Sequence, residues 1–294
     1  MILVSGGTGL LGRQVVRRLT DRSLGVGVLT RDPGSAADLA AGGVDIVQGD
    51  LRDRTSVAAA VDGATTVVAA AHGFVGPRGI SPATVDRDGN IRLIEAARAV
   101  GAHIVLLSVV GASPDSHMEL FRMKYAAEQH LFAGDASSTI VRATAFTELW
   151  IRIMRETAAG GGRPLVFGRG QSLVNFVSVA DVAALVDHVV DDPHARGQVW
   201  EIGGPDNLTM NELARLVQET DGRAGAPRHV PRFMLQAMAH TVGLVVPQLG
   251  RQARASLAMD AADHPFDSAP LHRRLRDLPV TSVADVLGQP STAR

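Results

Sequence analysis

The first half of this 294-residue chain alternates between short apolar runs rich in β-branched residues and longer amphipathic segments. The apolar runs lie at residues 2–5, 25–30, 44–48, 65–71, 103–110 and 138–143. Their hydrophobicity is continuous, which is typical of strands buried on both faces of a sheet. The segments between them place apolar residues three and four positions apart, as amphipathic helices do. Because strand, helix and strand follow one another repeatedly, the sequence predicts an α/β fold with right-handed crossovers and a doubly wound parallel sheet.

A glycine-rich segment, VSGGTGLLGR, follows the first apolar run and opens the first helical segment. This strand-to-helix position is the context that a dinucleotide fingerprint requires. Side chains at its glycines would keep a pyrophosphate away from the backbone N–H groups and from the positive end of the helix. We therefore expect a Rossmann-type fold with a cofactor-binding loop. Its residues are Gly6, Gly7, Thr8, Gly9, Leu10, Leu11 and Gly12.

The second half of the chain is less regularly patterned. The sequence there predicts a helix at 179–192, a strand at 198–204 and a helix at 208–222. Thr209 begins the last helix, with Glu212 three residues further on, which is the spacing of a capping box. Residues 223–265 are expected to be irregular, because they mix proline, arginine and methionine without a helical or strand period.

We expect two parts within a single structural unit. Residues 1–145 form a dinucleotide-binding core, and residues 146–294 complete the sheet and form a small C-terminal substrate-binding subdomain. Large side chains of the second part are candidate walls of a substrate pocket, and each is equally compatible with ordinary core packing. They are Phe146, Trp150, Phe233, Met234 and Met238.

The charge balance argues against a polyanionic partner. The net charge is −1 and no basic block is present, so we expect a small-molecule substrate and neither nucleic-acid nor membrane binding. The absence of cysteine excludes disulfides, thiol nucleophiles and thiolate metal sites, and we expect no metal. The chain begins directly with a strand, and its apolar runs are shorter than the roughly 20 residues that cross a bilayer. We expect a cytoplasmic protein, either monomer or homodimer.

Polar and small residues follow the predicted strands. Arg31 lies about 20 residues past the loop, where an acidic residue would otherwise bind the ribose of NAD. A guanidinium there can bind a 2′-phosphate, which predicts a preference for NADP(H) over NAD(H); a solvated loop arginine is the alternative. Asp50 could accept a hydrogen bond from the adenine amino group or cap the next helix. Ala70 and Ala71 would let a ribose lie against the backbone, whereas His72 is interpreted as a bystander.

One lysine stands out in a chain that otherwise uses arginine. Lysine and arginine together number 29, yet Lys124 is the only lysine, and its neighbour Tyr125 is the only tyrosine. The two basic residue types are not interchangeable where a compact ammonium or a movable proton is needed. Lys124 is therefore a candidate functional residue, with an ordinary surface lysine as the alternative.

These segments together resemble the short-chain dehydrogenase/reductase superfamily, specifically its NmrA-like and isoflavone-reductase-like branch. The resemblance covers nearly the whole chain. It rests on GGTGLLG, TRDP, GDLRD, LLSVVGA, KYAAE, VRATAF, FVSVADVA and WEIGGPDNLTMNELA. It implies a protein that binds NAD(P)H.

The resemblance also implies roles for particular residues. In that family the helix after the fifth strand carries a lysine that holds the nicotinamide ribose, and Lys124 stands at this position. Ser108 matches the catalytic serine of the superfamily, although a serine that ends a buried strand is often only a satisfied polar group. Leu51 would lie beside the cofactor, and Ala143 and Phe146 would lie near its carboxamide.

One departure from the superfamily concerns its proton donor. Most members place a tyrosine one helical turn before the lysine, where this chain has Leu120. Tyr125 follows Lys124 about 100° around the helix, so it should point elsewhere. Isoflavone-reductase-like members lack that tyrosine and are enzymes, whereas NmrA itself is a nucleotide-binding regulator.

Two functions are compatible with this pattern. The first is an NADPH-dependent reductase of a small organic acceptor, such as a quinone, an enone or a polycyclic ketone, with Lys124 and Ser108 as catalytic residues. The second is a redox sensor that binds NADP(H) without turnover and acts through a protein partner. An apolar cavity over the nicotinamide would favour the enzyme.

Overall fold

The computed structural model describes residues 1–77, 79–134 and 138–289. The chain forms two compact units. The first comprises Met1–Arg142 and Val182–Glu201, and the second comprises Ala143–Asp181 and Ile202–Arg294. The first unit includes this later segment because Val199–Glu201 supply most of an edge strand of its sheet.

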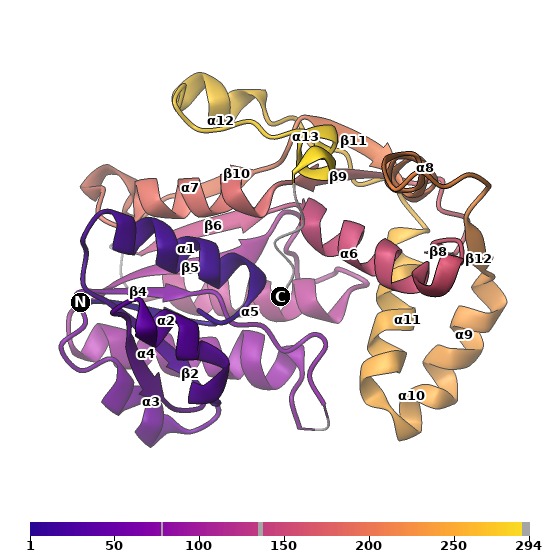
Figure 1. Cartoon of the computed structure of the whole chain (residues 1–294). Helices are drawn as coiled ribbons and strands as arrows, with labels where there is room; N and C mark the ends of the chain where they lie inside the picture. The colour runs from indigo at the N-terminus through magenta and orange to yellow at the C-terminus, as the bar shows by residue number, and fades with distance from the viewer. Residues whose placement is uncertain (78, 135–137, 290–294) are drawn as a thin grey trace. The chain divides into compact units, whose positions relative to one another are not determined.

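The described residues build a central seven-stranded sheet in the order β10-β6-β5-β4-β1-β2-β3 (Figure 1). The strands are β1 (Ile2–Ser5), β2 (Val26–Thr30), β3 (Asp45–Gln48), β4 (Thr66–Ala69), β5 (His103–Val109), β6 (Thr139–Ala143) and β10 (Val199–Ile202). β1 pairs in parallel with both β2 and β4, and the pairs β2–β3 and β4–β5 are also parallel. The predicted α/β, Rossmann-type doubly wound sheet is confirmed.

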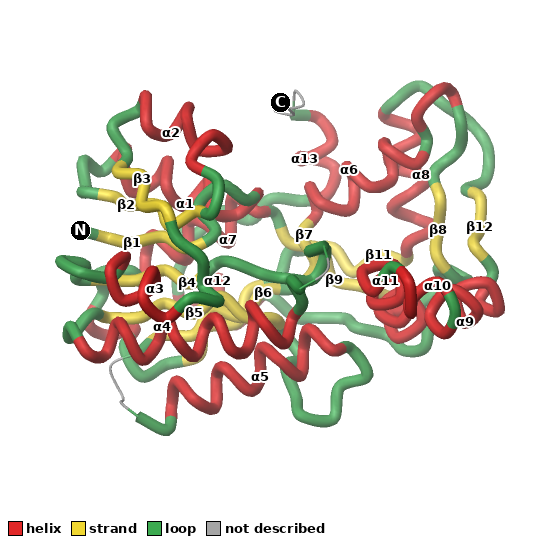
Figure 2. Tube along the Cα trace, turned by 90° about the horizontal axis from the view of Figure 1, so that it is seen from below, coloured by secondary structure: helices red, strands yellow, loops and turns green. Residues whose placement is uncertain are grey.

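Helices cover both faces of this sheet. On one face lie α1 (Leu10–Asp21) and α7 (Val179–Val189); on the other lie α3 (Arg54–Ala60), α4 (Asp88–Ala99) and α5 (Glu119–Phe132) (Figure 1). β1, β2 and β4 are buried along their whole length, as their continuous apolar sequences predict. Figure 2 shows α4 and α5 side by side beneath the sheet. The unit also contains the short helical segments η1 (Pro33–Ala36), α2 (Ala37–Ala41) and η4 (Pro193–Ala195).

The strand order reverses between β1 and β4, which is the topological switch point of a doubly wound sheet. Loops at the carboxyl ends of the strands flanking this point form the usual ligand crevice. The glycine loop follows β1, and the Ala70–Ala71 segment follows β4. The fold therefore positions two of the predicted cofactor-binding segments on either side of the switch point.

A π-helical turn, η2 (Pro82–Arg87), precedes α4. Ser81 and Thr84 form a reciprocal capping box at its start. The helical segment that continues into α4 therefore begins at Pro82. η2 packs closely against α5, so it belongs to the environment of Lys124.

Helix α5 is docked by a stripe of buried residues three and four positions apart: Lys124, Ala127, Glu128 and Leu131. Two of the four are charged. Glu128 accepts hydrogen bonds from Arg142 of β6, at 3.0 Å from Nε and 2.6 Å from Nη2. The helix is therefore fixed to the sheet partly by buried charge pairs.

The second unit contains two small sheets and a helical hairpin. Its strands are β7 (Ala145–Phe146), β8 (Leu165–Phe167), β9 (Leu173–Val177), β11 (Asp206–Thr209) and β12 (Arg228–Val230), in the sheets β11-β9-β7 and β12-β8. Its helices are α6 (Thr147–Thr157), η3 (Ala159–Gly161), α8 (Met210–Thr220), α9 (Arg232–His240), α10 (Val242–Val245), α11 (Pro247–Met259), α12 (Ala269–Arg274) and α13 (Val283–Gly288). The predicted capping box of Thr209 and Glu212 is confirmed at the start of α8.

The expectation that residues 223–265 are irregular was wrong. They contain β12 and the hairpin of α9, α10 and α11 (Figure 1). Pro231 and Pro247 stand at helix N-termini, where proline is tolerated because its missing N–H has no helical partner. No helix in the described part of the chain is long and apolar enough to span a membrane.

Candidate functional site

The glycine loop between β1 and α1 is closed too tightly for side chains. Gly6 has a φ of +77°, and a Cβ there would lie 2.7 Å from the backbone nitrogen of Ala71. A Cβ on Gly12 would overlap the carbonyl oxygen of Gly6. The loop therefore packs against the segment that follows β4, which brings Ala71 next to the predicted phosphate loop.

The N-terminus of α1 presents its backbone donors without competition. Gly9 is the N-cap and supplies no side-chain acceptor, and the first turn carries no acidic residue. The first N–H to find a helical carbonyl is that of Arg13, which bonds Gly9 O at 3.0 Å. The preceding N–H groups, of Leu10, Leu11 and Gly12, are the ones that a helix start leaves for an anion.

Arg13 forms hydrogen bonds and an ion pair that stabilise this loop. Its Nε donates to the carbonyl of Thr8 at 3.2 Å, its Nη2 donates to the carbonyl of Ser35 at 2.7 Å, and its Nη1 pairs with Asp38. Arg13 was not predicted from the sequence, because an arginine in the first turn of a helix carries no distinctive signal. The contacts show that it ties the phosphate loop to the segment after β2.

Arg31 is exposed directly after β2. The next residue, Asp32, turns its carboxylate to the N–H of Gly34 at 3.0 Å and so caps η1. Asp50 forms an ion pair with Arg52, whose hydrogen bonds lower the pKa of that carboxyl; the positive charge of Arg31 lowers it further. Arg31 and Asp50 therefore lie within electrostatic reach of each other.

The alternative role of Asp50 as a helix cap was wrong. The N-cap of α3 is Asp53, whose side chain accepts from Thr55 N at 3.0 Å. Leu51 is 7% exposed and packs in the hydrophobic core. Ala70 donates its N–H to the carbonyl of Ser5 at 3.1 Å, which continues the β4–β1 ladder to the edge of the glycine loop.

Lys124 is buried, with its side chain only 6% exposed. Its Nζ donates to the carbonyl of Leu107 at 2.8 Å and lies 3.1 Å from Oδ1 of Asp86, a residue with no exposed surface. The interpretation of Lys124 as an ordinary surface lysine is therefore wrong. Asp86 was not singled out from the sequence, since its segment has the pattern of an amphipathic helix.

Ser108 follows Leu107 at the carboxyl end of β5. It is 5% exposed, and its Oγ has no hydrogen-bond partner among the described residues. A buried hydroxyl without a partner is costly and uncommon. Ser108 is therefore not the satisfied polar group that was the alternative interpretation, and it has donor and acceptor capacity left for a ligand.

His72 lies beside this cluster, in the loop after β4. It keeps an exposed edge, yet surrounding protein desolvates the ring and lowers its pKa below the ordinary value. The positive charge of Lys124 adds to this lowering, and the negative charge of Asp86 opposes it. His72 is thus within electrostatic reach of both charged groups.

The position of the missing tyrosine is occupied by Leu120, one turn before Lys124 on α5. Tyr125 lies outside the buried stripe that contains Lys124 and is only partly buried. Ala143 ends β6 and Phe146 ends β7, and both belong to the second unit. Their predicted proximity to the carboxamide of a cofactor stays a prediction.

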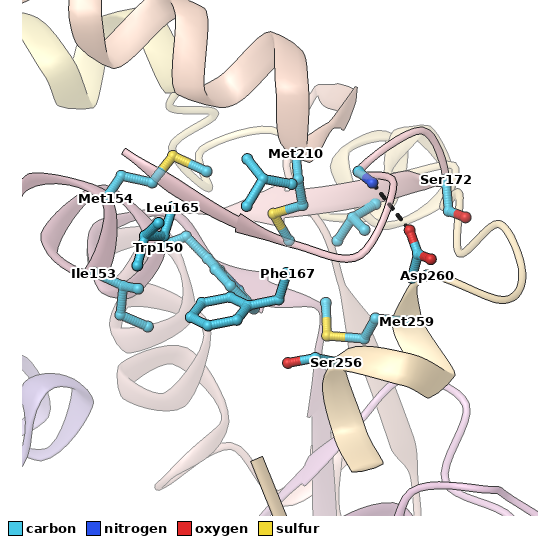
Figure 3. A pocket seen from close by; sticks show the side chains of 13 residues that line it. Trp150, Ile153, Met154, Leu165, Phe167, Ser172, Met210, Ser256, Met259 and Asp260 are labelled. Atoms are coloured by element: carbon cyan, nitrogen blue, oxygen red, sulfur yellow. Dashed lines mark hydrogen bonds between the residues drawn. The ribbon is translucent and has the colours of Figure 1, made fainter. Parts of the chain in front are cut away.

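The second unit contains an apolar pocket of its own (Figure 3). Trp150 and Met154 of α6, Phe167 of β8 and Met259 of α11 are among its lining residues. Its charged group is Asp260, which accepts from Gly170 N at 2.9 Å, the bond dashed in Figure 3, and from Arg232 at 2.6 Å. The pocket therefore offers apolar contact surface, and its carboxylate is already occupied.

The other candidate wall residues of this unit differ in burial. Met238 packs against the small core beneath α9 and α11, whereas Phe233 and Met234 are 68% and 47% exposed. Trp150 is thus the one of these candidates that lines the described pocket.

Residues 6–193, well over half of the chain, match the family described as NAD(P)H-binding. The chain belongs to this family. The resemblance to the short-chain dehydrogenase/reductase superfamily, in its NmrA-like branch, is confirmed, and the expected nicotinamide cofactor is confirmed with it.

Relatives with named activities are similar over most of the chain. The NAD(P)H azoreductase of Xenophilus azovorans is 29% identical and aligns with 84% of this chain and 82% of its own. The photosystem II assembly factor Ycf39 of Trieres chinensis is 25% identical and aligns with 82% of this chain and 76% of its own. The NADPH complex of the quinone oxidoreductase QOR2 of Escherichia coli has a TM-score of 0.77 and 22% identity over 98% of both chains, a likeness that shows the fold.

The residues described above fit such a cofactor. The glycine loop packs tightly beside the start of α1, whose first N–H donors are free for a pyrophosphate, and Ser108 has an unused hydroxyl. These groups lie in the first unit, at the carboxyl ends of its strands or at the start of the helix that follows β1.

Proposed function

We propose that this protein is an NADPH-dependent reductase of a small organic acceptor such as a quinone, an enone or a polycyclic ketone. The protein is an NAD(P)H-dependent oxidoreductase, in keeping with its family and with relatives that are named as an azoreductase and a quinone oxidoreductase. We place it in the cytoplasm, acting on a small molecule without nucleic acid or membrane, as a monomer or a homodimer.

One observation carries this proposal. A buried ammonium, Lys124, bonds the carbonyl of Leu107 near the end of β5, and the next residue, Ser108, has a buried hydroxyl with no partner among the described residues. Burying both groups without a ligand is unfavourable, since each has hydrogen-bonding capacity that water would otherwise satisfy. A ligand with hydroxyl or carbonyl oxygens would satisfy them.

Each residue of the site then has a task. The glycine loop and the start of α1 bind the pyrophosphate, and Arg31 binds the 2′-phosphate that distinguishes NADPH from NADH. Lys124 donates to the nicotinamide ribose, and Ser108 donates to the acceptor oxygen on which negative charge develops. When bound, NADPH supplies the hydride.

The absence of a phenol at position 120 limits the acceptors. A positioned general acid typically contributes about 10²–10⁴-fold to a rate, so a simple ketone, whose alkoxide needs a proton at once, should be a poor substrate. Quinones and conjugated enones form stabilised anions, which Lys124, Ser108 or water can protonate afterwards. The site therefore favours conjugated acceptors.

A second candidate function is supported by the similarity to Ycf39, a relative named as an assembly factor. In this case the protein would bind NADP(H) as a sensor and act through a protein partner without turnover. The missing tyrosine is compatible with this role. Binding without oxidation of the cofactor is what separates it from the reductase.

Steady-state NADPH oxidation with a panel of acceptors tests the proposal. We expect consumption with a quinone or an enone to exceed that with an aliphatic ketone, and Leu120→Tyr to narrow the gap. Leu131→Met, a buried change further along α5, is a control that should leave the ratio unchanged. NADPH binding without consumption by any acceptor above background would favour the sensor.

A further inference from the structure

The carboxylate of Asp86 joins two segments of the site. Its Oδ2 accepts a hydrogen bond from the N–H of Gly73 at 2.8 Å, and its Oδ1 lies 3.1 Å from Nζ of Lys124. Gly73 belongs to the loop after β4, two residues beyond Ala71, and Lys124 belongs to α5. Asp86 therefore fixes the ammonium relative to the backbone that packs against the glycine loop.

Fold stability alone gives no reason for this pair. Asp86 has no exposed surface and the Lys124 side chain is 6% exposed, so both charges have been removed from water. An apolar pair of similar volume is often as stable as a buried ion pair or more so. Elsewhere among the described residues, the buried carboxylates of Glu128 and Asp260 pair with arginines that keep some exposure, so a fully buried lysine here differs from the chain's usual cation.

The ammonium keeps unused donor capacity. Lysine carries three N–H donors. Among the described residues, Nζ forms a hydrogen bond to the carbonyl of Leu107 and an ion pair with Asp86, and it forms no hydrogen bond to a third acceptor. The third donor is available to a ligand at the end of β5.

The local backbone is shaped to place Asp86 here. It lies in the π-helical turn η2, and π-helical turns occur frequently at functional sites. Asp88, two residues further on, is partly exposed and pairs with Arg87 at 2.6 Å. The two aspartates therefore have different environments, and Asp88 provides a matched control.

We propose that Asp86 is the positioning residue of the site. It holds the Lys124 ammonium so that the remaining N–H donor meets the nicotinamide ribose. The inference rests on the proposed function where it predicts an effect of Asp86 on turnover. The effect of Asp86 on cofactor binding can be measured without any acceptor.

The single lysine makes a direct test possible. Protein labelled with ¹⁵N-lysine has one side-chain Nζ resonance, which reports on Lys124 alone. We expect this resonance to be protected from exchange with water in the wild type and to shift when NADP⁺ is added. Asp86→Asn keeps the acceptor for Gly73 but removes the charge, so it should expose the resonance to exchange and weaken NADP⁺ binding about tenfold or more. Asp88→Asn should do neither.

A double-mutant cycle with Lys124→Met separates positioning from general damage. If Asp86 acts through Lys124, then Asp86→Asn lowers kcat and NADP⁺ affinity in the wild type but adds little in the Lys124→Met background. Equal losses in both backgrounds would overturn the proposal. Unfolding midpoints are recorded for every variant.

If Asp86→Asn does not fold, Asp86→Glu replaces it, because this change keeps the charge but moves it by one methylene. Asp86→Glu should then shift the Nζ resonance and lower kcat. An unchanged resonance with unchanged NADP⁺ affinity would overturn the proposal.

Failure of this inference differs from failure of the proposed function. If NADP⁺ shifts the Lys124 resonance in the wild type and Asp86→Asn abolishes the shift, the positioning role holds even where no acceptor is reduced. If NADP⁺ binds and leaves the resonance unchanged, the positioning role is contradicted whether or not the protein turns over.

Discussion

Two ion pairs with buried carboxylates involve residues of α5 that lie four positions apart on one face of the helix, and they differ in how many hydrogen bonds the cation leaves unused. Glu128 receives two hydrogen bonds from Arg142, which also reaches Glu201 at 3.1 Å. Lys124 instead meets Asp86 and one carbonyl and keeps a donor free. The pKa of Arg142 is raised above its ordinary value, chiefly by its hydrogen bonds to Glu128.

The difference suggests that one pair stabilises the fold and the other serves ligand binding. A bidentate arginine pair satisfies the carboxylate and leaves nothing to offer a ligand. A lysine pair fixes the ammonium and leaves part of it unused. We therefore assign the Arg142–Glu128 pair to holding α5 on the sheet and the Lys124–Asp86 pair to the function of the site.

The largest effect is expected from Lys124→Met. It removes the ammonium from the site, so turnover with a quinone should fall by about 10²-fold or more. Lys124→Arg keeps the charge but enlarges and flattens the head group in a buried site, so it should also lose activity or cofactor affinity. Steady-state kinetics and NADPH titration check both variants. Full retention of both properties in Lys124→Arg would show that the compact ammonium is not needed.

The opposite pattern is expected at Arg142. Arg142→Met leaves the buried carboxylate of Glu128 uncompensated, which should lower the free energy of unfolding by about 3–5 kcal/mol. The folded fraction should keep its kcat, because no ligand contact is lost. The paired change Arg142→Met with Glu128→Leu should recover much of the stability, as measured by denaturant unfolding. A loss of kcat at unchanged stability would reverse the assignment of the two pairs.

These contrasts also show what the sequence could and could not predict. The continuous apolar runs located β1 to β6 within a few residues, and the glycine loop and Lys124 were recognised because their residue types are unusual at their positions. Asp86 was not predicted as a site residue, because it contacts Lys124 only through the packing of η2 on α5. This tertiary contact leaves no pattern in the local sequence. The hairpin α9–α11 was missed because its prolines mark helix starts as well as breaks.

Cofactor selectivity should respond to Arg31. Arg31→Ala removes a charge-assisted hydrogen bond to the 2′-phosphate, so NADPH binding should weaken by about 1.5–3 kcal/mol while NADH binding changes little. Arg215→Ala, which removes an exposed arginine of the second unit, is the matched control. Fluorescence titration of both cofactors measures the effect, and equal affinity of the wild type for NADPH and NADH would remove Arg31 from the site.

The smallest effect is expected from Tyr125→Phe. Its side chain lies outside the buried stripe that carries Lys124, so kcat and the affinity for NADPH should stay within about twofold of the wild type. A large loss of kcat without a loss of stability would mean that the only phenol of the chain reaches the site, and the acceptor preference would then need another explanation.

The proposal requires that the chain transfers hydride from NADPH to a conjugated acceptor, with Lys124 holding the nicotinamide ribose and no tyrosine at position 120. Single-turnover oxidation of NADPH deuterated at one or the other face of C4, with an enone as acceptor, tests it most directly. The account predicts a primary isotope effect with one labelled face only, label retained on carbon in the product, and loss of the reaction in Lys124→Met. Binding of NADPH without oxidation, or oxidation that is unchanged in Lys124→Met, would contradict it.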